Sequence, residues 1–373
     1  MPTMRLDHLR HVLEQAGLTG AVVRQPANVY YLTGYPAAFD RPSFVVIGER
    51  TALVVPGDPG TVQSKVSSDV LVTGYAVPGS TIDRVADIAS TSAEALRKAA
   101  KAAGLRGERI GVEVSQVSAS HVAAIAQLGR VTPLGDQVLA LRRIKDADEI
   151  ARIRLAVHLN DLGMGAAARA IAEGVSEFDV LNQVVAVMQN AAGVPIDVLP
   201  ATNAFISGPR TLLAAAPATP RRLERGDHMI IDLNPFIDHY KGDTTRTFSV
   251  GEPPDAIRKI HDSLVRGLES AEAVMRPGAK ANDVYAALVR PIVEAGSSAG
   301  IRFHGGHAMG IEHVERPYII PGDAMRLEAG MVISLEPGVY LPDIGGVRVE
   351  DNYLITEDGC ETVSRYPREV IVC

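Results

Sequence analysis

Acidic residues occupy positions in the second half of this 373-residue chain where a charge is unfavourable. Asp232 interrupts the apolar run HMII, and Asp243 follows eleven residues later. A lone aspartate of this kind is more often a turn residue at a strand end, because an unpaired buried charge is strongly destabilising. If Ile237 and Asp238 form the tip of a hairpin, however, Asp232 lies directly opposite Asp243. Like charges that face each other across two strands need a neutralising cation, so the spacing predicts a divalent metal ion.

A second pair of acids follows the same logic. Glu336 in ISLEPG and Glu350 in VRVEDN flank the segment PGVYLPDIGG, whose midpoint is Asp343. Folding this segment on itself brings the two glutamates together, although Pro337 makes the ladder irregular just after Glu336. Strand alternation places Arg348 on the same face as Glu350. Arg348 therefore either binds a substrate carboxylate or orients that glutamate.

Three histidines lie close together in the glycine-rich stretch FHGGHAMGIEH, at His304, His307 and His313. Four carboxylates and one imidazole carry a formal charge of about −4, which suits two divalent ions. For His304 the alternatives are a backbone contact at a turn or a place in the pocket lining. For His313 they are a local structural role or contact with the substrate.

The elements that must position these residues change in character near residue 140. The first part combines short apolar runs with an alanine-rich amphipathic stretch, which is typical of an α/β domain. The second part mixes long helical patterns with strand-like runs, and no internal repeat is apparent. We expect helices over 6–15 and 86–103 and strands over 21–23, 44–47 and 52–55 in the first part. In the second part we expect helices from about 150 to 174, 176–189, 255–275 and 282–295, and strands over 229–233, 244–250, 331–335 and 347–355.

Composition excludes several classes of protein. The 37 basic and 44 acidic residues give a net charge of −7, without a long basic run, which argues against a nucleic-acid partner. The N-terminus lacks the apolar core of a signal peptide, and no apolar run approaches the roughly 18 residues that cross a bilayer. The two cysteines, Cys360 and Cys373, fit neither a zinc site nor a redox pair. We therefore expect a cytoplasmic protein without a membrane partner, in which His and carboxylates hold any metal.

The order of these motifs resembles the pita-bread metallohydrolases. The segments IIDLNPFIDHYKGDTTRTFSVG, GHAMGIEHVERP, LEAGMVISLEPGVY and GGVRVEDNYLIT are similar to the prolidase and aminopeptidase P (Xaa-Pro peptidase) branch. The segment QPANVYYLTGY resembles the creatinase-type N-terminal domain of that branch. The resemblance implies a creatinase-like α/β domain over 1–140, an α+β pita-bread catalytic domain over 141–373, and a homodimer.

The resemblance also implies roles for individual residues. Glu336 would act as the catalytic residue that moves a proton from water to the leaving nitrogen. An oxygen-rich shell with one imidazole favours two Mn²⁺ ions per chain, with Co²⁺ or Zn²⁺ as alternatives. Substrate contacts are expected from His304, His313 and Arg348. The implied metal ligands are Asp232, Asp243, His307, Glu336 and Glu350.

Two departures from the family pattern concern the substrate side. Family peptidases usually carry a histidine at the position of Val314, whereas here a histidine stands one place earlier, at His313. One step along an extended segment turns a side chain to the opposite face, so His313 is not a simple replacement. Another family histidine is expected where this chain has Ala215.

Three functions follow from the resemblance. The first is a metallopeptidase-like hydrolase of the Xaa-Pro dipeptidase or aminopeptidase type, which cleaves the amide bond before proline in short peptides. The alternative is a hydrolase or lyase of a small non-peptide compound, as in creatinase, ectoine hydrolase and a dimethylsulfoniopropionate lyase. The third is a catalytically silent binding protein; such relatives lose metal ligands, whereas this chain keeps all five.

Overall fold

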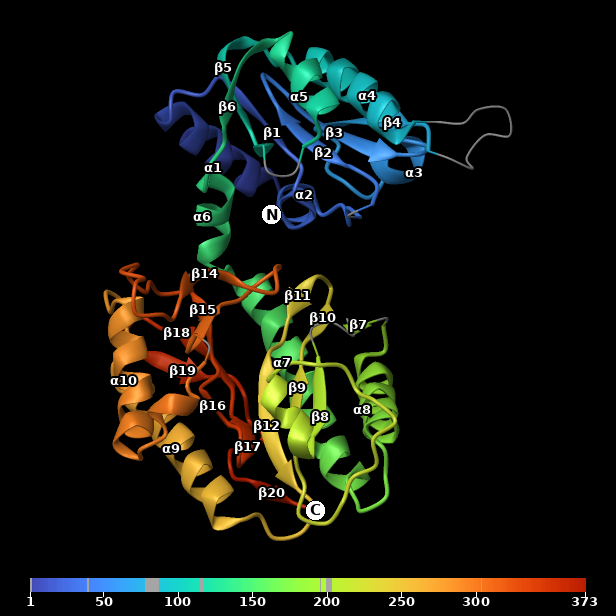
Figure 1. The fold of residues 1–373 in the computed structure, drawn as a ribbon. Helices are drawn as coiled ribbons and strands as arrows, with labels where there is room; N and C mark the ends of the chain where they lie inside the picture. Colours follow the sequence, from blue (N-terminus) through green and yellow to red (C-terminus); the bar gives the residue numbers. More distant parts are fainter. Residues whose placement is uncertain are drawn as a thin grey trace. The chain divides into compact units, whose positions relative to one another are not determined.

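The computed structural model describes residues 2–38, 40–77, 87–114, 117–194, 196–198, 203–302 and 304–373. The chain separates into two compact units, Met1–Arg142 and Arg143–Cys373 (Figure 1). Each unit has its own hydrophobic core, and each is described by itself below.

The first unit is built on a mixed six-stranded sheet with the order β4-β3-β2-β1-β5-β6. The β1–β2 and β2–β3 pairs are antiparallel, and the other three pairs are parallel. The strands are β1 Gly20–Val23, β2 Phe44–Ile47, β3 Thr51–Pro56, β4 Val70–Tyr75, β5 Gly107–Val112 and β6 Gly129–Pro133. The helices are α1 Pro2–Gln15, α2 Pro26–Thr33, α3 Gly60–Gln63, α4 Ile88–Ala102, α5 Ala119–Ala126 and α6 Gln137–Arg143.

The central strands of this sheet are apolar because both of their faces are covered. All residues of β1 and β2 are buried, and the alanine-rich face of α4 packs against this core. The side chain of Asp87 caps α4 by accepting from the backbone N–H groups of Ala89 and Ser90. The helix predicted over 86–103 is therefore confirmed over the described residues, whereas Ala86 lies outside them.

The second unit consists of two halves, in each of which a helix pair covers a sheet (Figure 1). In the first half, α7 and α8 pack on the sheet β20-β12-β9-β8; in the second half, α9 and α10 pack on the sheet β14-β13-β15-β18-β19. The helices are α7 Ala147–Ala170, α8 Glu177–Ala192, α9 Asp255–Glu272 and α10 Ala281–Glu294, with 3₁₀ turns η2 Gly208–Leu213 and η3 Ser298–Gly300.

The strands of the second unit complete the expected α+β arrangement. Two small sheets, β11-β10-β7 and β16-β17, extend the two halves. Within the described part of the chain, no helix is long and apolar enough to cross a membrane. The strands are β7 Asp197–Val198, β8 Ala204–Ser207, β9 His228–Leu233, β10 Pro235–Ile237, β11 Tyr240–Lys241, β12 Thr244–Ser249, β13 Gly306–Ala308, β14 Glu315–Tyr318, β15 Val332–Leu335, β16 Gly338–Leu341, β17 Gly345–Arg348, β18 Asp351–Ile355, β19 Cys360–Thr362 and β20 Ile371–Val372.

The two halves of the second unit are built alike, which the sequence did not reveal. Gly174 and Gly278 both adopt a positive φ, 83° and 87°. Their backbone N–H groups donate to the carbonyls of Leu223 and Leu327, each over 2.8 Å. Gly278 follows Gly174 by 104 residues, and Leu327 follows Leu223 by the same distance in the sequence. The structure therefore contains an internal repeat.

The same offset relates two of the predicted metal ligands. Strands β9 and β15 begin 104 residues apart, and Asp232 and Glu336 occupy equivalent positions near their ends. Each half therefore contributes an acid from the same place in its sheet. The repeat explains why carboxylates that are distant in the sequence meet in one site.

The first hairpin differs in register from the prediction. Asp232 pairs with Thr245, and Asp243 is the diagonal neighbour of Asp232. The turn lies one residue further along than predicted, at Asp238 and His239, which both have a positive φ. A two-residue turn with two positive φ values matches the twist of the flanking strands. Because the shift of two residues leaves every side chain on its face, the two aspartates still converge.

The second hairpin has the predicted register. Strand β15 pairs with β18 and β16 with β17 in one continuous register, and Glu336 and Glu350 fall at the break between the two ladders. At this break the backbone N–H of Glu336 donates to Gly305 over 2.9 Å, and that of Glu350 donates to Thr245 over 3.0 Å. The irregularity expected at Pro337 thus opens the ladder where the glutamates stand.

Candidate metal centre

All five residues predicted as metal ligands lie together in the second unit. Asp232, Asp243 and Glu350 each offer a carboxylate oxygen within 4.8 Å of the others. The Nε2 atom of His307 lies 3.5 Å from Asp243 Oδ2 and 3.4 Å from Glu336 Oε1. The strand ends and the broken ladder therefore place four carboxylates around one imidazole.

The orientation of His307 is set by its own strand. Its Nδ1 lies 2.8 Å from the carbonyl oxygen of Ala308. Because a carbonyl only accepts, Nδ1 carries the proton and Nε2 presents a lone pair to the carboxylates. Two donors about 2.1 Å from a shared ion stand about 3.0–3.4 Å apart. The Nε2–oxygen separations are close to this spacing, so the donor set fits a divalent metal.

The carboxylates resist ionisation without a cation. Burial raises the pKa of Asp232 and Asp243 to about 6 and that of Glu350 to about 7. Burial, reinforced by Glu350, raises the pKa of Glu336 well above its usual value. A divalent ion among these groups would reverse this effect, because it stabilises their charged forms.

Arg348 neutralises one side of the cluster. Its Nη2 lies 2.5 Å from Asp232 Oδ2, and its Nη1 donates to the carbonyl of Ala214 over 3.2 Å. Its Nε donates to the hydroxyl of Thr245, which in turn donates to Glu350 Oε2 over 2.6 Å. Arg348 thus contacts Asp232 directly and reaches Glu350 only through Thr245.

Lys241 is a second cation at the centre, and the sequence analysis missed it. The side chain is fully buried, and its Nζ lies 2.5 Å from Asp243 Oδ2 and 3.0 Å from the carbonyl oxygen of His313. A lysine beside a predicted turn suggests a solvated surface residue. The signal that was available is its spacing, because residues two apart in an extended segment share a face, and Lys241 precedes Asp243 by two.

Arg246, also missed, holds the backbone behind the centre. Its Nη1 donates to the carbonyls of Thr245 and Glu350, over 2.9 and 2.6 Å. Its Nη2 and Nε are also bonded, so all five guanidinium N–H groups have acceptors. The remaining acceptors are Asp351 Oδ1 and the carbonyls of Tyr366 and Pro367.

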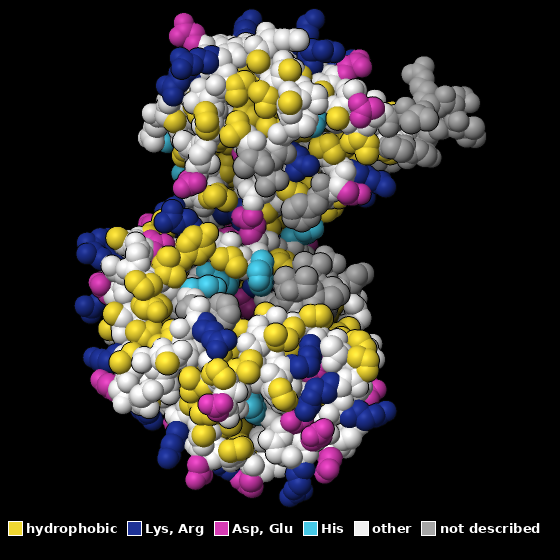
Figure 2. Space-filling model, in the orientation of Figure 1, with side chains coloured by type: hydrophobic (Ala, Val, Ile, Leu, Met, Phe, Trp, Pro, Cys, Tyr) yellow, Lys and Arg dark blue, Asp and Glu magenta, His cyan; other side chains and the backbone are white. Residues whose placement is uncertain are grey.

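His304 and His313 flank the ligand histidine. The ring of His304 is 5.7 Å from that of His307, and its Nδ1 lies 3.5 Å from Glu336 Oε1. The ring of His313 is 6.2 Å from that of His307. Figure 2 shows histidine side chains gathered in one area on the surface of the second unit. The three histidines of the glycine-rich stretch therefore form one cluster.

The position of His313 corrects an assumption made from the sequence. The segment 310–314 is a series of bends rather than an extended strand, so one step along it does not reverse a side chain. The carboxylate of Glu315 holds these bends by accepting from the backbone N–H groups of Ile311 and Glu312. The ring of His313 therefore lies 6.2 Å from that of His307, although His313 is exposed, as Val314 is.

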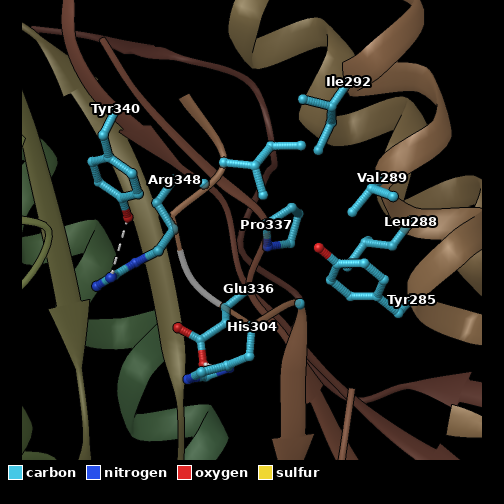
Figure 3. Close-up of a pocket in the computed structure, with 12 residues that line it drawn as sticks. Tyr285, Leu288, Val289, Ile292, His304, Glu336, Pro337, Tyr340 and Arg348 are labelled. Carbon is cyan, nitrogen blue, oxygen red and sulfur yellow. Dashed lines mark hydrogen bonds and ion pairs between the residues drawn. The ribbon is translucent and has the colours of Figure 1, made fainter. Parts of the chain in front are cut away.

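A small pocket lies beside Glu336, with about 20 Å³ of space for the centre of a water molecule (Figure 3). One wall is apolar and comes from α10, and the opposite wall is polar and joins the metal centre. Figure 3 shows Pro337 between the two walls. The apolar wall includes Tyr285, Leu288, Val289 and Ile292, and the polar wall includes His304, Glu336, Tyr340 and Arg348.

Comparison with known proteins agrees with this fold. The sequence model described as Metallopeptidase family M24 matches residues 151–357, and that of the Creatinase/Prolidase N-terminal domain matches residues 5–144. The Xaa-Pro dipeptidase of Pyrococcus furiosus is 30% identical and covers 98% of this chain and 99% of its own length. An uncharacterized peptidase of Bacillus subtilis, YqhT, is 28% identical over 99% of this chain and 100% of its own.

Solved structures show the same architecture. The Xaa-Pro dipeptidase of Bacillus anthracis superposes with a TM-score of 0.87 at 24% identity, covering 100% of both chains. The prolidase of Pyrococcus horikoshii superposes with a TM-score of 0.82 at 26% identity, covering 98% of this chain and 99% of that one. The expected pita-bread fold is confirmed. The chain belongs to metallopeptidase family M24 and is an enzyme of that divalent-metal-dependent class.

Proposed function

We propose that this enzyme uses two divalent ions, Mn²⁺ by preference, to cleave the amide bond before proline in dipeptides or short peptides. The observation that carries the proposal is the convergence of four carboxylates and one imidazole beside the pocket. The relatives named Xaa-Pro dipeptidase support it. Asp232, Asp243, His307, Glu336 and Glu350 would hold the ions.

Metal, when bound, would supply a Lewis acid that polarises the substrate carbonyl and lowers the pKa of the attacking water. Glu336 moves the proton. It is the proposed ligand that also lines the pocket, and its side chain is 15% exposed. Its place between the centre and the pocket lets Glu336 take a proton from the attacking water and pass it to the leaving nitrogen.

The pocket supports the proposed preference for proline. The pyrrolidine ring would pack against Leu288, Val289 and Ile292, while the reacting amide lies at Glu336. Partial burial lowers the pKa of His313 to about 4 and that of His304 below its usual value. Both rings are therefore neutral at pH 7, and we propose that they hydrogen-bond the peptide in place of the histidines absent at positions 215 and 314.

A small non-peptide substrate is the second candidate. The observation that favours it is the exposure of Ala215 and Val314, which offer the substrate no polar group at two positions on that side. Hydrolysis assays with Mn²⁺ separate the candidates. The panel contains Xaa-Pro dipeptides, Xaa-Ala dipeptides, a longer peptide with proline second, creatine and betaine-like osmolytes. We expect turnover of the proline peptides; inactivity on all peptides by protein with full metal content would overturn the peptidase proposal.

The cellular setting and assembly are also proposals. Both cysteines, Cys360 and Cys373, are free thiols, which fits a reducing compartment such as the cytoplasm. We propose a homodimer on the resemblance to the Xaa-Pro peptidase branch. Light scattering of the purified chain tests the dimer.

A further inference from the structure

We propose that Lys145 is a positioning residue for the His313 loop, which comprises residues 310–314. A buried ion pair between Lys145 and Glu315 fixes the bends of this loop, and the bends set where His313 meets the substrate. The inference rests on the proposed function, which gives His313 a contact with the peptide, and it adds the residue that positions this contact.

The ion pair is shielded from water on both sides. Lys145 Nζ lies 3.1 Å from Glu315 Oε2, and the two side chains are only 1% and 7% exposed. Removing an ammonium and a carboxylate from water often costs as much free energy as their attraction returns, so two apolar side chains could stabilise the fold equally well. The geometry that the pair imposes is therefore a better account of it than stability.

The carboxylate of Glu315 is the group that holds the loop. Its Oε1 accepts from the backbone N–H groups of Ile311 and Glu312, over 3.2 and 3.3 Å, while Oε2 faces the ammonium. Gly310 lies directly against this carboxylate, because an added Cβ would be 2.9 Å from each of its oxygens. An apolar side chain at position 315 could not accept the two N–H groups.

Lys145 is itself fixed where the chain enters the second unit, shortly after Arg142. Its backbone N–H donates to the carbonyl of Gly330 over 3.0 Å. Its Nζ also donates to the carbonyl of Arg143, over 3.2 Å. Because the ammonium is held by these contacts, it gives the Glu315 carboxylate a fixed partner.

The opposite side of the loop is bound to β11. The N–H of Lys241 donates to the carbonyl of Gly310 over 2.9 Å, and its Nζ donates to the carbonyl of His313 over 3.0 Å. Two lysines from different elements therefore hold the loop. Since Lys241 also contacts Asp243, Lys145 is the one of the two that can be replaced without touching a proposed metal ligand.

Hydrogen–deuterium exchange of the full chain tests whether Lys145 holds the loop. Lys145→Met removes the ammonium beside Glu315, so we expect the N–H groups of Ile311 and Glu312 to exchange about tenfold faster or more. The Mn²⁺ content should stay that of the wild type. The kcat/KM for a Xaa-Pro dipeptide should fall by about tenfold, and by no more than in His313→Ala. Unchanged exchange in a folded Lys145→Met variant would overturn the inference.

A double-mutant cycle tests whether Lys145 acts through His313. Lys145→Met should have little further effect on kcat/KM in the His313→Ala background, because the contact that it positions is already absent. A merely structural role would instead lower kcat/KM by the same factor in both backgrounds. Equal factors would therefore overturn the inference.

Two further variants serve as controls. Glu315→Gln keeps the shape of the side chain and should reproduce the faster exchange even if Lys145→Met folds poorly by circular dichroism. The two changes together should be no worse than either alone, and additive losses would contradict their action as one pair. Lys98→Met breaks an exposed ion pair with Glu94 on α4 and should change neither exchange of the loop nor activity.

The two readouts separate this inference from the proposed function. A wild type that binds Mn²⁺ but cleaves no peptide would overturn the proposed function. The exchange measurement needs no substrate, so it would still decide whether Lys145 holds the His313 loop.

Discussion

At the scale of single residues, the centre depends on how each side chain is held. The contact with Ala308 fixes which nitrogen of His307 faces the carboxylates. Glu350 accepts from two hydroxyls, Thr245 Oγ1 on one oxygen and Ser334 Oγ on the other. These contacts restrict both ligands to one orientation, as expected of residues behind a metal.

Substitutions in the histidine cluster should distinguish a metal ligand from a residue that contacts the substrate. We expect His307→Ala to lose Mn²⁺ and to lower kcat/KM by about 100-fold or more, because a ligand is removed. His313→Ala should keep its metal and lose less activity. Metal content and kcat/KM of the two variants, measured side by side, test this. An equal loss of activity with metal retained only in His313→Ala would mean that His313 makes an essential contact with the substrate.

At the scale of elements, Arg246 joins β12 to β18 and to the chain near the C-terminus. Its five N–H groups all have acceptors, which include the buried Asp351 and the carbonyl of the buried Glu350. A lysine has three donors and a different shape, so it cannot replace this set. The backbone position of Glu350 therefore depends on a residue that never faces the ions.

Replacing Arg246 tests this dependence. We expect Arg246→Lys to lower the free energy of unfolding by about 3–5 kcal/mol, since buried partners lose their donors. Urea denaturation followed by circular dichroism measures it. Arg258→Lys changes an exposed arginine paired with Glu252, and it should shift stability by less than about 1 kcal/mol. Similar small shifts in both variants would contradict the role of Arg246.

Helix α9 contains a buried histidine that should make stability depend on pH. Burial lowers the pKa of His261 from 6.5 to about 4, and its Nε2 has no hydrogen-bond partner among the described residues. Above pH 6.5 the ring is neutral in both the folded and unfolded states. Below it only the unfolded state binds the proton, so stability falls as the pH drops from 6.5 towards 4, by about 3 kcal/mol in all.

The comparison of wild type with His261→Gln isolates this effect, because both proteins keep the metal ligands. Urea midpoints between pH 8 and pH 4 should fall more steeply in the wild type. The difference in unfolding free energy between the two proteins should therefore narrow at low pH. Parallel curves would show that His261 does not contribute.

The sequence predicted the elements better than their exact pairing. The helix at Ser176 begins as expected, because Ser176 and Asp179 cap each other's backbone N–H groups. The turn of the first hairpin was misplaced because no glycine marks it: Asp238 and His239 adopt positive φ values instead. For Lys241 the only signal was its spacing of two residues from Asp243. The role of Arg246 was beyond reach, since a pattern of residue types does not show which acceptors a cation will meet.

At the scale of the whole molecule, the second unit is an internal repeat whose halves meet at the proposed metal centre. Asp232 and Asp243 come from the first half, and His307, Glu336 and Glu350 come from the second. The repeat escaped the sequence analysis because few residue types recur, although hydrogen bonds such as those of Gly174 and Gly278 do. Bound metal would therefore add a link between two sheets that hydrogen bonds, such as those of Thr245 and Arg246 with Glu350, already join.

Metal removal should accordingly weaken the second unit. Mn²⁺ at about 100 times its Kd should stabilise the folded state by about 2.7 kcal/mol. Thermal unfolding, measured once with Mn²⁺ and once with a chelator, gives the shift in the unfolding temperature that the metal causes. Asp243→Ala should abolish activity, retain the fold and show a much smaller shift. An equal shift in that variant would exclude Asp243 as a ligand.

The two ladders of the second hairpin share one register. The tip of this hairpin is therefore not needed to align Glu336 with Glu350. The pairing of β15 with β18 already sets Glu336 opposite Glu350, and the turn beyond β16 and β17 adds nothing to that alignment. Pro342 and Asp343 at the tip are exposed. For protein engineering, the bond between them is a place where a peptide tag, a fluorescent reporter or new chain termini can be introduced without moving the catalytic carboxylates.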